Sequence, residues 1–174
     1  MILFLDFDGV LHPQYEGQTV PSDVAFCHLP RFEDVMRDFP AVKVVISSTW
    51  REQFGLTSLK SRFSPDIAAR IIGITPIYPL SHPPAVMQRE WEITTWLSVR
   101  GLQDAPWIAL DDAIWEFKNN RDNVIACTSH AGFSAATESK LRAALSLAFA
   151  DKTIMEKSSV PPACRNALQI LKRS

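Results

Sequence analysis

The amino-acid sequence predicts an α/β fold in which helices cover both faces of a mostly parallel β-sheet. Two observations lead to this prediction. Short apolar runs end in polar or turn-forming residues, which is typical of buried strands. Segments with helical spacing of apolar residues lie between these runs, and such alternation is typical of parallel sheets. The 174 residues, 47% of them hydrophobic and 21% charged, suffice for one globular domain with its own core.

Five apolar runs are candidate strands. They are residues 2–7, 42–47, 71–75, 107–110 and 123–126. The runs at 2–7, 42–47 and 107–110 are apolar at nearly every consecutive position. We therefore expect these strands to be buried on both faces of the sheet.

Apolar residues spaced three and four positions apart predict four helices. The patterns lie within residues 29–39, 54–63, 93–97 and 141–148. Pro30 suits the first turn of the first helix, and Ser134 suits the N-cap position ahead of the last one. Gly55 interrupts the pattern of the second helix.

The remaining segments predict one domain and a tail. Residues 12–28 lack periodicity, and residues 75–84 contain four prolines, which exclude a regular helix. Because neither segment is long enough for another domain, we expect one domain over residues 1–150. Residues 151–174 would form a C-terminal tail, in which a short helix over 163–172 either packs on the domain or frays.

Composition excludes several classes of protein. A net charge of -1 gives no support to a broad basic surface for nucleic acid or an anionic membrane. Three cysteines without a CxxC pair argue against a disulfide framework and against a zinc site. The N-terminal apolar run is too short for a signal peptide, and no stretch has the length of a membrane helix. We expect a cytoplasmic protein with reduced thiols and no membrane partner.

Polar side chains follow three of the predicted strands. Asp6 and Asp8 close the first strand, Ser47 closes the second, and Asp111 and Asp112 close a later one. The carboxyl ends of parallel strands line one crevice, so these groups should meet there. Four converging carboxylates need a cation, and a site of oxygen ligands alone favours Mg²⁺.

This arrangement can perform phosphoryl chemistry. A magnesium ion with free positions attracts phosphate oxygens, and small hydroxyls with strand-end N–H groups can hold the others. A carboxylate beside the phosphate can attack it and form an acyl phosphate. A second carboxylate two residues further on points to the same side, where it can act as general acid and base.

The motifs in this order resemble those of the haloacid dehalogenase-like superfamily. Residues 6–11, Asp-Phe-Asp-Gly-Val-Leu, resemble its first motif, Ser47 the second and Asp111-Asp112 the fourth. Arg89 is the best match to the third, with Arg51 as a competitor. More narrowly, the strings Phe-Asp-Gly-Val-Leu-His-Pro, Ile-Ser-Ser-Thr-Trp-Arg and Ala-Leu-Asp-Asp resemble the small domains of bacterial RNA-repair ("Swiss Army Knife") proteins. The resemblance implies a three-layer α/β/α Rossmann-like domain with little or no cap.

The resemblance also implies a role for each motif residue. Asp6 would be the nucleophile and a magnesium ligand, and Asp8 the general acid and base with its backbone carbonyl on the metal. Asp111 and Asp112 would complete the magnesium site. The two remaining catalytic residues would be Ser47, holding a phosphoryl oxygen, and Arg89, offsetting charge on the nucleophile and phosphate.

Four further residues near this crevice are expected to bind the substrate: Gly9, His12, Ser48 and Arg51. The hydroxyl of Ser48 and the imidazole of His12 could instead order their own loops. Trp50 could stack on a base or pack in the core. Residues 12–28 and 72–88, where the superfamily inserts caps, are too short for a large one.

An open site suits a large phosphorylated substrate such as a nucleic-acid end, while a small nucleotide or sugar phosphate would also fit. We expect no stable protein partner. The leading function is phosphomonoester hydrolysis; the alternative is a regulatory module that binds phosphate and Mg²⁺ without turnover. Receiver domains place their acidic pair before the phosphorylated residue, and dehalogenases need no magnesium. The late Asp111-Asp112 pair therefore favours the phosphatase.

Overall fold

A five-stranded, all-parallel sheet forms the centre of the computed structural model, which describes residues 1–15, 20–79 and 87–158. The strands are β1 (Ile2–Leu5), β2 (Lys43–Ile46), β3 (Ile71–Ile74), β4 (Trp107–Asp111) and β5 (Val124–Ala126), in the spatial order β3-β2-β1-β4-β5. All five predicted strands are confirmed, and the α/β Rossmann-like fold with them. The first ends before the motif because β1 pairs with its neighbours only through Leu5.

Strand β1 lies between β2 and β4, and each of its four residues has a partner on both sides. The chain winds outward from β1 to β2 and β3, then crosses back to β4 and β5 on the other side. This reversal is the topological switch point of a doubly wound sheet, where ligands bind outside the carboxyl ends of the strands. The fold therefore places the ends of β1 and β4 side by side at the ligand crevice.

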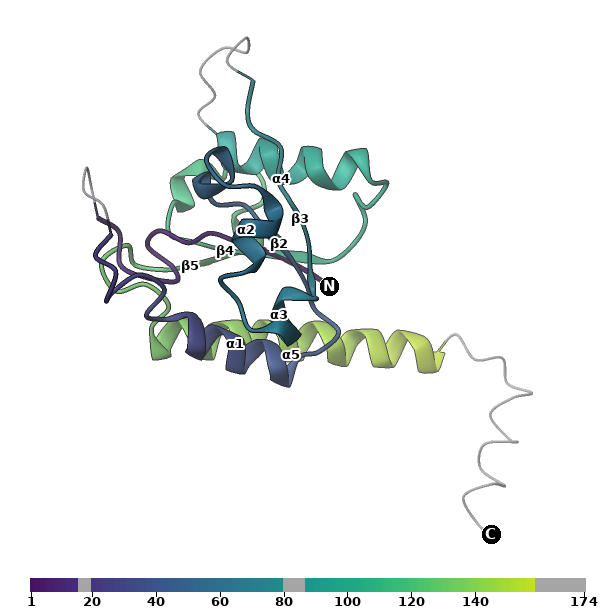
Figure 1. Ribbon diagram of the computed structural model, residues 1–174. Helices are drawn as coiled ribbons and strands as arrows, with labels where there is room; N and C mark the ends of the chain where they lie inside the picture. Colours follow the sequence, from purple (N-terminus) through teal and green to yellow (C-terminus); the bar gives the residue numbers. More distant parts are fainter. Residues whose placement is uncertain (16–19, 80–86, 159–174) are drawn as a thin grey trace. The chain divides into compact units, whose positions relative to one another are not determined.

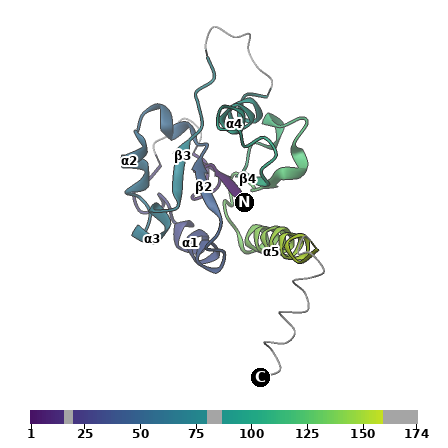
Figure 2. The ribbon, with the colours of Figure 1, turned by 90° about the vertical axis from the view of Figure 1, so that its right-hand side faces the viewer.

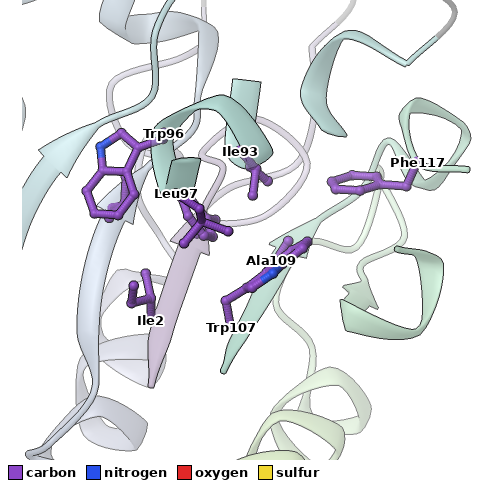
Figure 3. Packing of buried hydrophobic residues seen from close by; sticks show 9 residues of the cluster. Ile2, Ile93, Trp96, Leu97, Trp107, Ala109 and Phe117 are labelled. Carbon is purple, nitrogen blue, oxygen red and sulfur yellow. The ribbon is translucent and has the colours of Figure 1, made fainter. Parts of the chain in front are cut away.

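Successive side chains of the buried strands pack on opposite faces of the sheet. Ile2 and Phe4 point to the face covered by α4 (Gln88–Val99), where they cluster with Ile93 and Trp96 (Figure 3). Leu3 and the other residues of opposite parity point to the face covered by α1 (Leu29–Asp38). Figures 1 and 2 show α4 and α1 on opposite sides of the sheet. The predicted burial of β1 on both faces is confirmed.

The helices differ from the sequence pattern at one place. Residues 54–63 form no single helix, because Gly55 takes an extended conformation and breaks the segment. Within this segment only α2 (Leu56–Lys60) is helical. The short elements η1 (Thr49–Glu52) and α3 (Pro65–Ala68) lie before and after it. Further along, η2 (Ile114–Glu116) and η3 (Arg121–Asn123) are single 3₁₀ turns.

The last helix, α5 (Ala135–Ser158), begins where Ser134 was expected to cap it. The Ser134 hydroxyl accepts a hydrogen bond from the Thr137 N–H at 3.3 Å, which is N-cap geometry. The chain divides into one unit over Met1–Leu141 and a second that begins at Arg142. The domain boundary at residue 150 stays a prediction, and the tail helix expected over 163–172 lies outside the described residues.

No additional helix or strand covers the site from the two cap windows, as far as their described residues go. Residues 22–28 form turns, while 16–19 and 80–86 are outside the described ranges. None of the helices in the described part of the chain has the length and apolar character needed to cross a membrane.

Candidate active site

The first motif follows β1 as a tight turn. The Asp6 N–H donates to the Leu110 carbonyl of β4, and the N–H groups of Val10 and Leu11 both donate to the Phe7 carbonyl. Gly9 takes a positive φ of 66°, and a Cβ at this position would overlap the Asp112 carboxylate. Glycine is therefore required here both by the backbone conformation and by the close approach of Asp112, the residue that follows β4.

Three buried carboxylates meet at the ends of β1 and β4. Asp6, Asp111 and Asp112 each offer an oxygen, and these oxygens lie within 4.8 Å of one another. Arg89 on α4 contributes the cation: its Nη2 lies 3.0 Å from Asp6 Oδ2, and its Nε lies 3.2 Å from Asp111 Oδ2. Three carboxylates against one guanidinium leave a formal charge of about −2 in a buried space, which a divalent cation would neutralise.

Burial raises the pKa of two of the three carboxylates, Asp111 and Asp112. Burial raises the pKa of Asp111 to about 7, although Arg89 opposes the shift and Asp6 adds to it. Burial also raises the pKa of Asp112, whose Oδ2 has no hydrogen-bond partner among the described residues. Burial lowers the pKa of Arg89, but Asp6 and Asp111 outweigh it and raise that pKa, so Arg89 stays charged. A hard cation with oxygen ligands such as Mg²⁺ fits this donor set.

Arg89 and Arg51, the two candidates for the third-motif cation, have different partners. Arg51 is buried and pairs with Glu92 at 2.5 Å, and its Nη1 donates to the carbonyls of Ser47 and Ser48 at 2.9 and 2.7 Å. These bonds tie the loop after β2 to α4. Only Arg89 of the two has an ion pair with Asp6 among the described contacts.

Of the two serine hydroxyls that follow β2, one has a hydrogen-bond partner within the described residues and the other has none. The Ser47 Oγ is fully buried and has no hydrogen-bond partner within the described residues. A buried unpaired hydroxyl at a strand end is available to a ligand oxygen. The Ser48 Oγ accepts the Trp50 N–H at 3.4 Å and so caps η1. The structure thus gives Ser48 a role in its own loop.

Asp8 lies outside the group of three carboxylates, and both of its oxygens are held. His12 Nε2 lies 2.9 Å from Oδ1, and Trp50 Nε1 donates to Oδ2 at 3.0 Å. His12 is fully buried, and its Nδ1 accepts the N–H of Phe26 at 3.4 Å, which leaves Nε2 to donate to Asp8. Phe26 adopts a positive φ of 60°, an uncommon conformation for an aromatic residue.

Sequence reasoning missed two of these contacts. It left open whether His12 binds the substrate or orders its own loop, and it gave no partner for Trp50 or Arg51. The Trp50–Asp8 hydrogen bond and the Arg51–Glu92 ion pair both join residues from different elements. The one signal in the sequence was the position of Trp50 directly after the second motif.

Two cavities open beside the site, and Thr49 lines both of them. The smaller has a volume of about 230 Å³ and contains Arg51, Arg89 and Trp115 in its wall. The larger has a volume of about 770 Å³ and begins at Asp8 and Trp50. Asp8 therefore faces a different space from Arg89.

Comparison with known proteins gives one match. The family model described as "HAD domain in Swiss Army Knife RNA repair proteins" matches residues 2–137. A search of curated proteins and a search of solved structures each gave no match. The matched range contains every residue of the site described above.

Proposed function

The chain belongs to the family of HAD domains found in Swiss Army Knife RNA repair proteins, and on this premise we propose that it is a Mg²⁺-dependent phosphomonoester hydrolase acting on nucleic-acid ends or nucleotides. One observation carries the proposal. Three buried carboxylates, whose negative charge a single guanidinium does not balance, lie at the ends of β1 and β4. A module that binds phosphate without turnover would not need a general acid, whereas Asp8 is held by two hydrogen bonds beside the larger cavity, apart from the three carboxylates.

In this proposal Asp6 is the nucleophile. Its carboxylate oxygen attacks phosphorus, the bond from phosphorus to the ester oxygen breaks, and Asp6 becomes an aspartyl phosphate. Asp8 gives a proton to the departing oxygen and then takes one from the water that attacks the aspartyl phosphate. The second step releases inorganic phosphate and restores the Asp6 carboxylate, so protons and electrons balance over the cycle.

The neighbouring side chains hold the reacting groups. The Ser47 hydroxyl donates to a phosphoryl oxygen, and Arg89 orients the Asp6 carboxylate by its hydrogen bond at 3.0 Å. Asp6, Asp111 and Asp112, together with the backbone carbonyl of Asp8, would hold Mg²⁺. When bound, this ion neutralises phosphate charge in the transition state.

The same proposal places the protein in the cytoplasm. Cys27 and Cys127, the two cysteines within the described residues, are free thiols, which is typical of reducing compartments.

The decisive variant is Asp6→Asn, which preserves side-chain shape but removes the nucleophile. We expect turnover of p-nitrophenyl phosphate to fall by roughly 10³-fold or more, as removal of a catalytic nucleophile does elsewhere. The matched control is Asp104→Asn, which changes an exposed aspartate far along the chain and should leave turnover unchanged.

Thermal unfolding of both variants checks that the fold is intact. Full turnover in a folded Asp6→Asn protein would remove Asp6 from its role. A wild-type protein that binds phosphate with Mg²⁺ but turns over no ester would favour the regulatory module instead.

A further inference from the structure

The larger cavity lies where the group leaving phosphorus must go. Its volume of about 770 Å³ is within the range of small-ligand pockets. Asp8, which donates the proton to the leaving oxygen in the proposed function, lines this cavity with a side chain that is 30% exposed. The rest of the molecule attached to that oxygen therefore lies on the Asp8 side, away from the three buried carboxylates.

The rings of Trp50 and Phe54 form an aromatic wall on one side of the cavity, and Phe26 packs on Trp50. Trp50 and Phe54 have ring centroids 5.7 Å apart, and the Phe26 ring lies 5.3 Å from that of Trp50. The guanidinium of the exposed residue Arg62 lies over all three rings, at 5.3 to 5.7 Å from their centroids. Aromatic rings and a stacked guanidinium are the surfaces on which proteins place single bases.

The charge of the cavity limits what it can hold. Its charged lining residues, within the described part of the chain, are two carboxylates, Asp8 and Glu52, and one guanidinium, Arg62. A groove for a nucleic-acid strand needs several cations along its length, and these are missing from this lining. Gln14, Gln53 and Ser22 add side chains that can bond to a base edge.

We propose that this cavity, the base pocket, binds the one nucleoside attached to the scissile phosphate, with its base stacked against Phe54, Trp50 and Arg62. The proposal rests on the proposed function, because Asp8 defines the side from which the leaving group departs. The base pocket makes the enzyme prefer a phosphorylated nucleoside over a sugar phosphate that has no base. Of a nucleic-acid strand, it holds only one nucleotide.

The test compares two substrates that differ by the base. We expect kcat/KM to be at least about 10-fold higher for adenosine monophosphate, as its 3′ or 5′ isomer, than for ribose 5-phosphate. In Phe54→Ala and in Arg62→Ala this preference, the ratio of the two kcat/KM values, falls by about 10-fold. Arg100→Ala is the matched control, because Arg100 stacks on Trp96 at 4.1 Å outside the base pocket and should leave the preference intact.

Two further measurements keep the outcome independent of catalysis and of folding. Calorimetry with adenosine, which has no phosphate, should show binding to the metal-free wild-type protein and loss of binding in Arg62→Ala. Phe54→Leu replaces Phe54→Ala if the latter unfolds at a lower temperature.

A third measurement is the salt dependence of turnover. For a phosphorylated oligonucleotide, kcat/KM should change little between 50 and 200 mM salt, whereas an enzyme that binds a strand along a row of cations would lose orders of magnitude in kcat/KM.

Equal kcat/KM values for adenosine monophosphate and ribose 5-phosphate in the wild type would overturn the base pocket, as would steep salt dependence. Failure of the proposed function looks different: no phosphate ester, p-nitrophenyl phosphate included, would be turned over. Adenosine binding that depends on Arg62 would still support the pocket in that case, and absence of binding would count against it.

Discussion

Asp8 is the residue whose surroundings say most about its proposed role. Its two oxygens are bonded by His12 and Trp50, from the loop after β1 and from η1, so its carboxylate has one defined orientation. The packing of Trp50 against Phe7 and Phe26 fixes the indole that makes one of these bonds. Orientation of a general acid contributes to catalysis only where the leaving group needs a proton.

Trp50→Phe tests this orientation, since it keeps the ring but removes the N–H that bonds Asp8. We expect kcat for an alkyl phosphate to fall by roughly 10-fold, a part of the 10²–10⁴ that general acids contribute. Turnover of p-nitrophenyl phosphate should change little, because its leaving group needs no proton. Steady-state kinetics with both substrates measures the difference.

Trp96→Phe is the matched control, because Trp96 is a core residue whose Nε1 has no partner in the described residues. It should affect stability alone. An equal loss on both substrates in Trp50→Phe would show that Trp50 acts only through packing.

Single residues also show where sequence reasoning stops. The positions of Asp6, Asp111 and Asp112 after strands predicted their convergence, because strand ends meet at one edge of a parallel sheet. The partners of Ser48 and Arg51 could not be predicted, because they depend on how η1 turns after β2. Whether these two residues also touch the substrate stays a prediction.

Helix α4 carries two buried acidic residues that join it to loops around the site. Glu92 pairs with Arg51, and Glu90 accepts hydrogen bonds from the backbone N–H groups of Lys118, Asn119 and Asn120 at 2.7 to 2.9 Å. Burial opposes ionisation of Glu90, but these hydrogen bonds outweigh it and lower its pKa. An ionised Glu90 therefore anchors the segment that follows the fourth motif.

Glu90→Gln should destabilise the protein in a pH-dependent way. At pH 7 we expect a loss of roughly 1–3 kcal/mol in the free energy of unfolding, the usual cost of weakening charged hydrogen bonds. The pKa of Glu90 is lower in the folded state, so its contribution is complete above the ordinary carboxyl pKa and disappears as the pH falls through the folded value.

Urea unfolding at pH 7 and at pH 3 measures this effect, with Asp122→Asn, an exposed change, as the control. A difference between wild type and Glu90→Gln that is the same at both pH values would contradict an anchor based on charge.

Elements were predicted well where their pattern is local. Strands β1, β2 and β4 appear in the sequence as apolar runs because both of their faces are covered. A helix was predicted over residues 54–63, and the structure has only the short helix α2 there, because an extended Gly55 precedes it and the Ser64–Pro65 pair follows it. Ahead of these interruptions lies η1, whose Trp50 donates a hydrogen bond to Asp8.

For the molecule as a whole, the buried acidic group is a source of instability that Mg²⁺ should relieve. A ligand at a hundred times its Kd stabilises a protein by about 2.7 kcal/mol. For a chain of this size each kcal/mol raises Tm by roughly 2–4 °C, so saturating Mg²⁺ should raise Tm by about 5–10 °C. EDTA should reverse the shift and stop turnover.

Asp112→Asn is the matched variant, since it removes one buried charge without changing the side-chain shape. Its metal-free form should be at least as stable as the wild type, while its Mg²⁺-dependent shift in Tm should be largely lost. Differential scanning calorimetry with and without Mg²⁺ measures both effects. An equal shift in the two proteins would mean that Mg²⁺ binds elsewhere.

The sequence by itself determined the parallel α/β fold, the strand ends that hold the acidic residues, and the family to which the chain is similar. It could do so because burial on two faces gives continuous apolar runs, and because each motif and its place after a run can be read directly along the chain. Tertiary structure alone decided that Arg89 and not Arg51 pairs with Asp6, which lies 83 residues away in the chain. It also decided that Asp8 stands apart from the three carboxylates and that Arg62 joins the aromatic wall. Those choices depend on strand order and on the path of loops, because long-range contacts have no local signature in the chain.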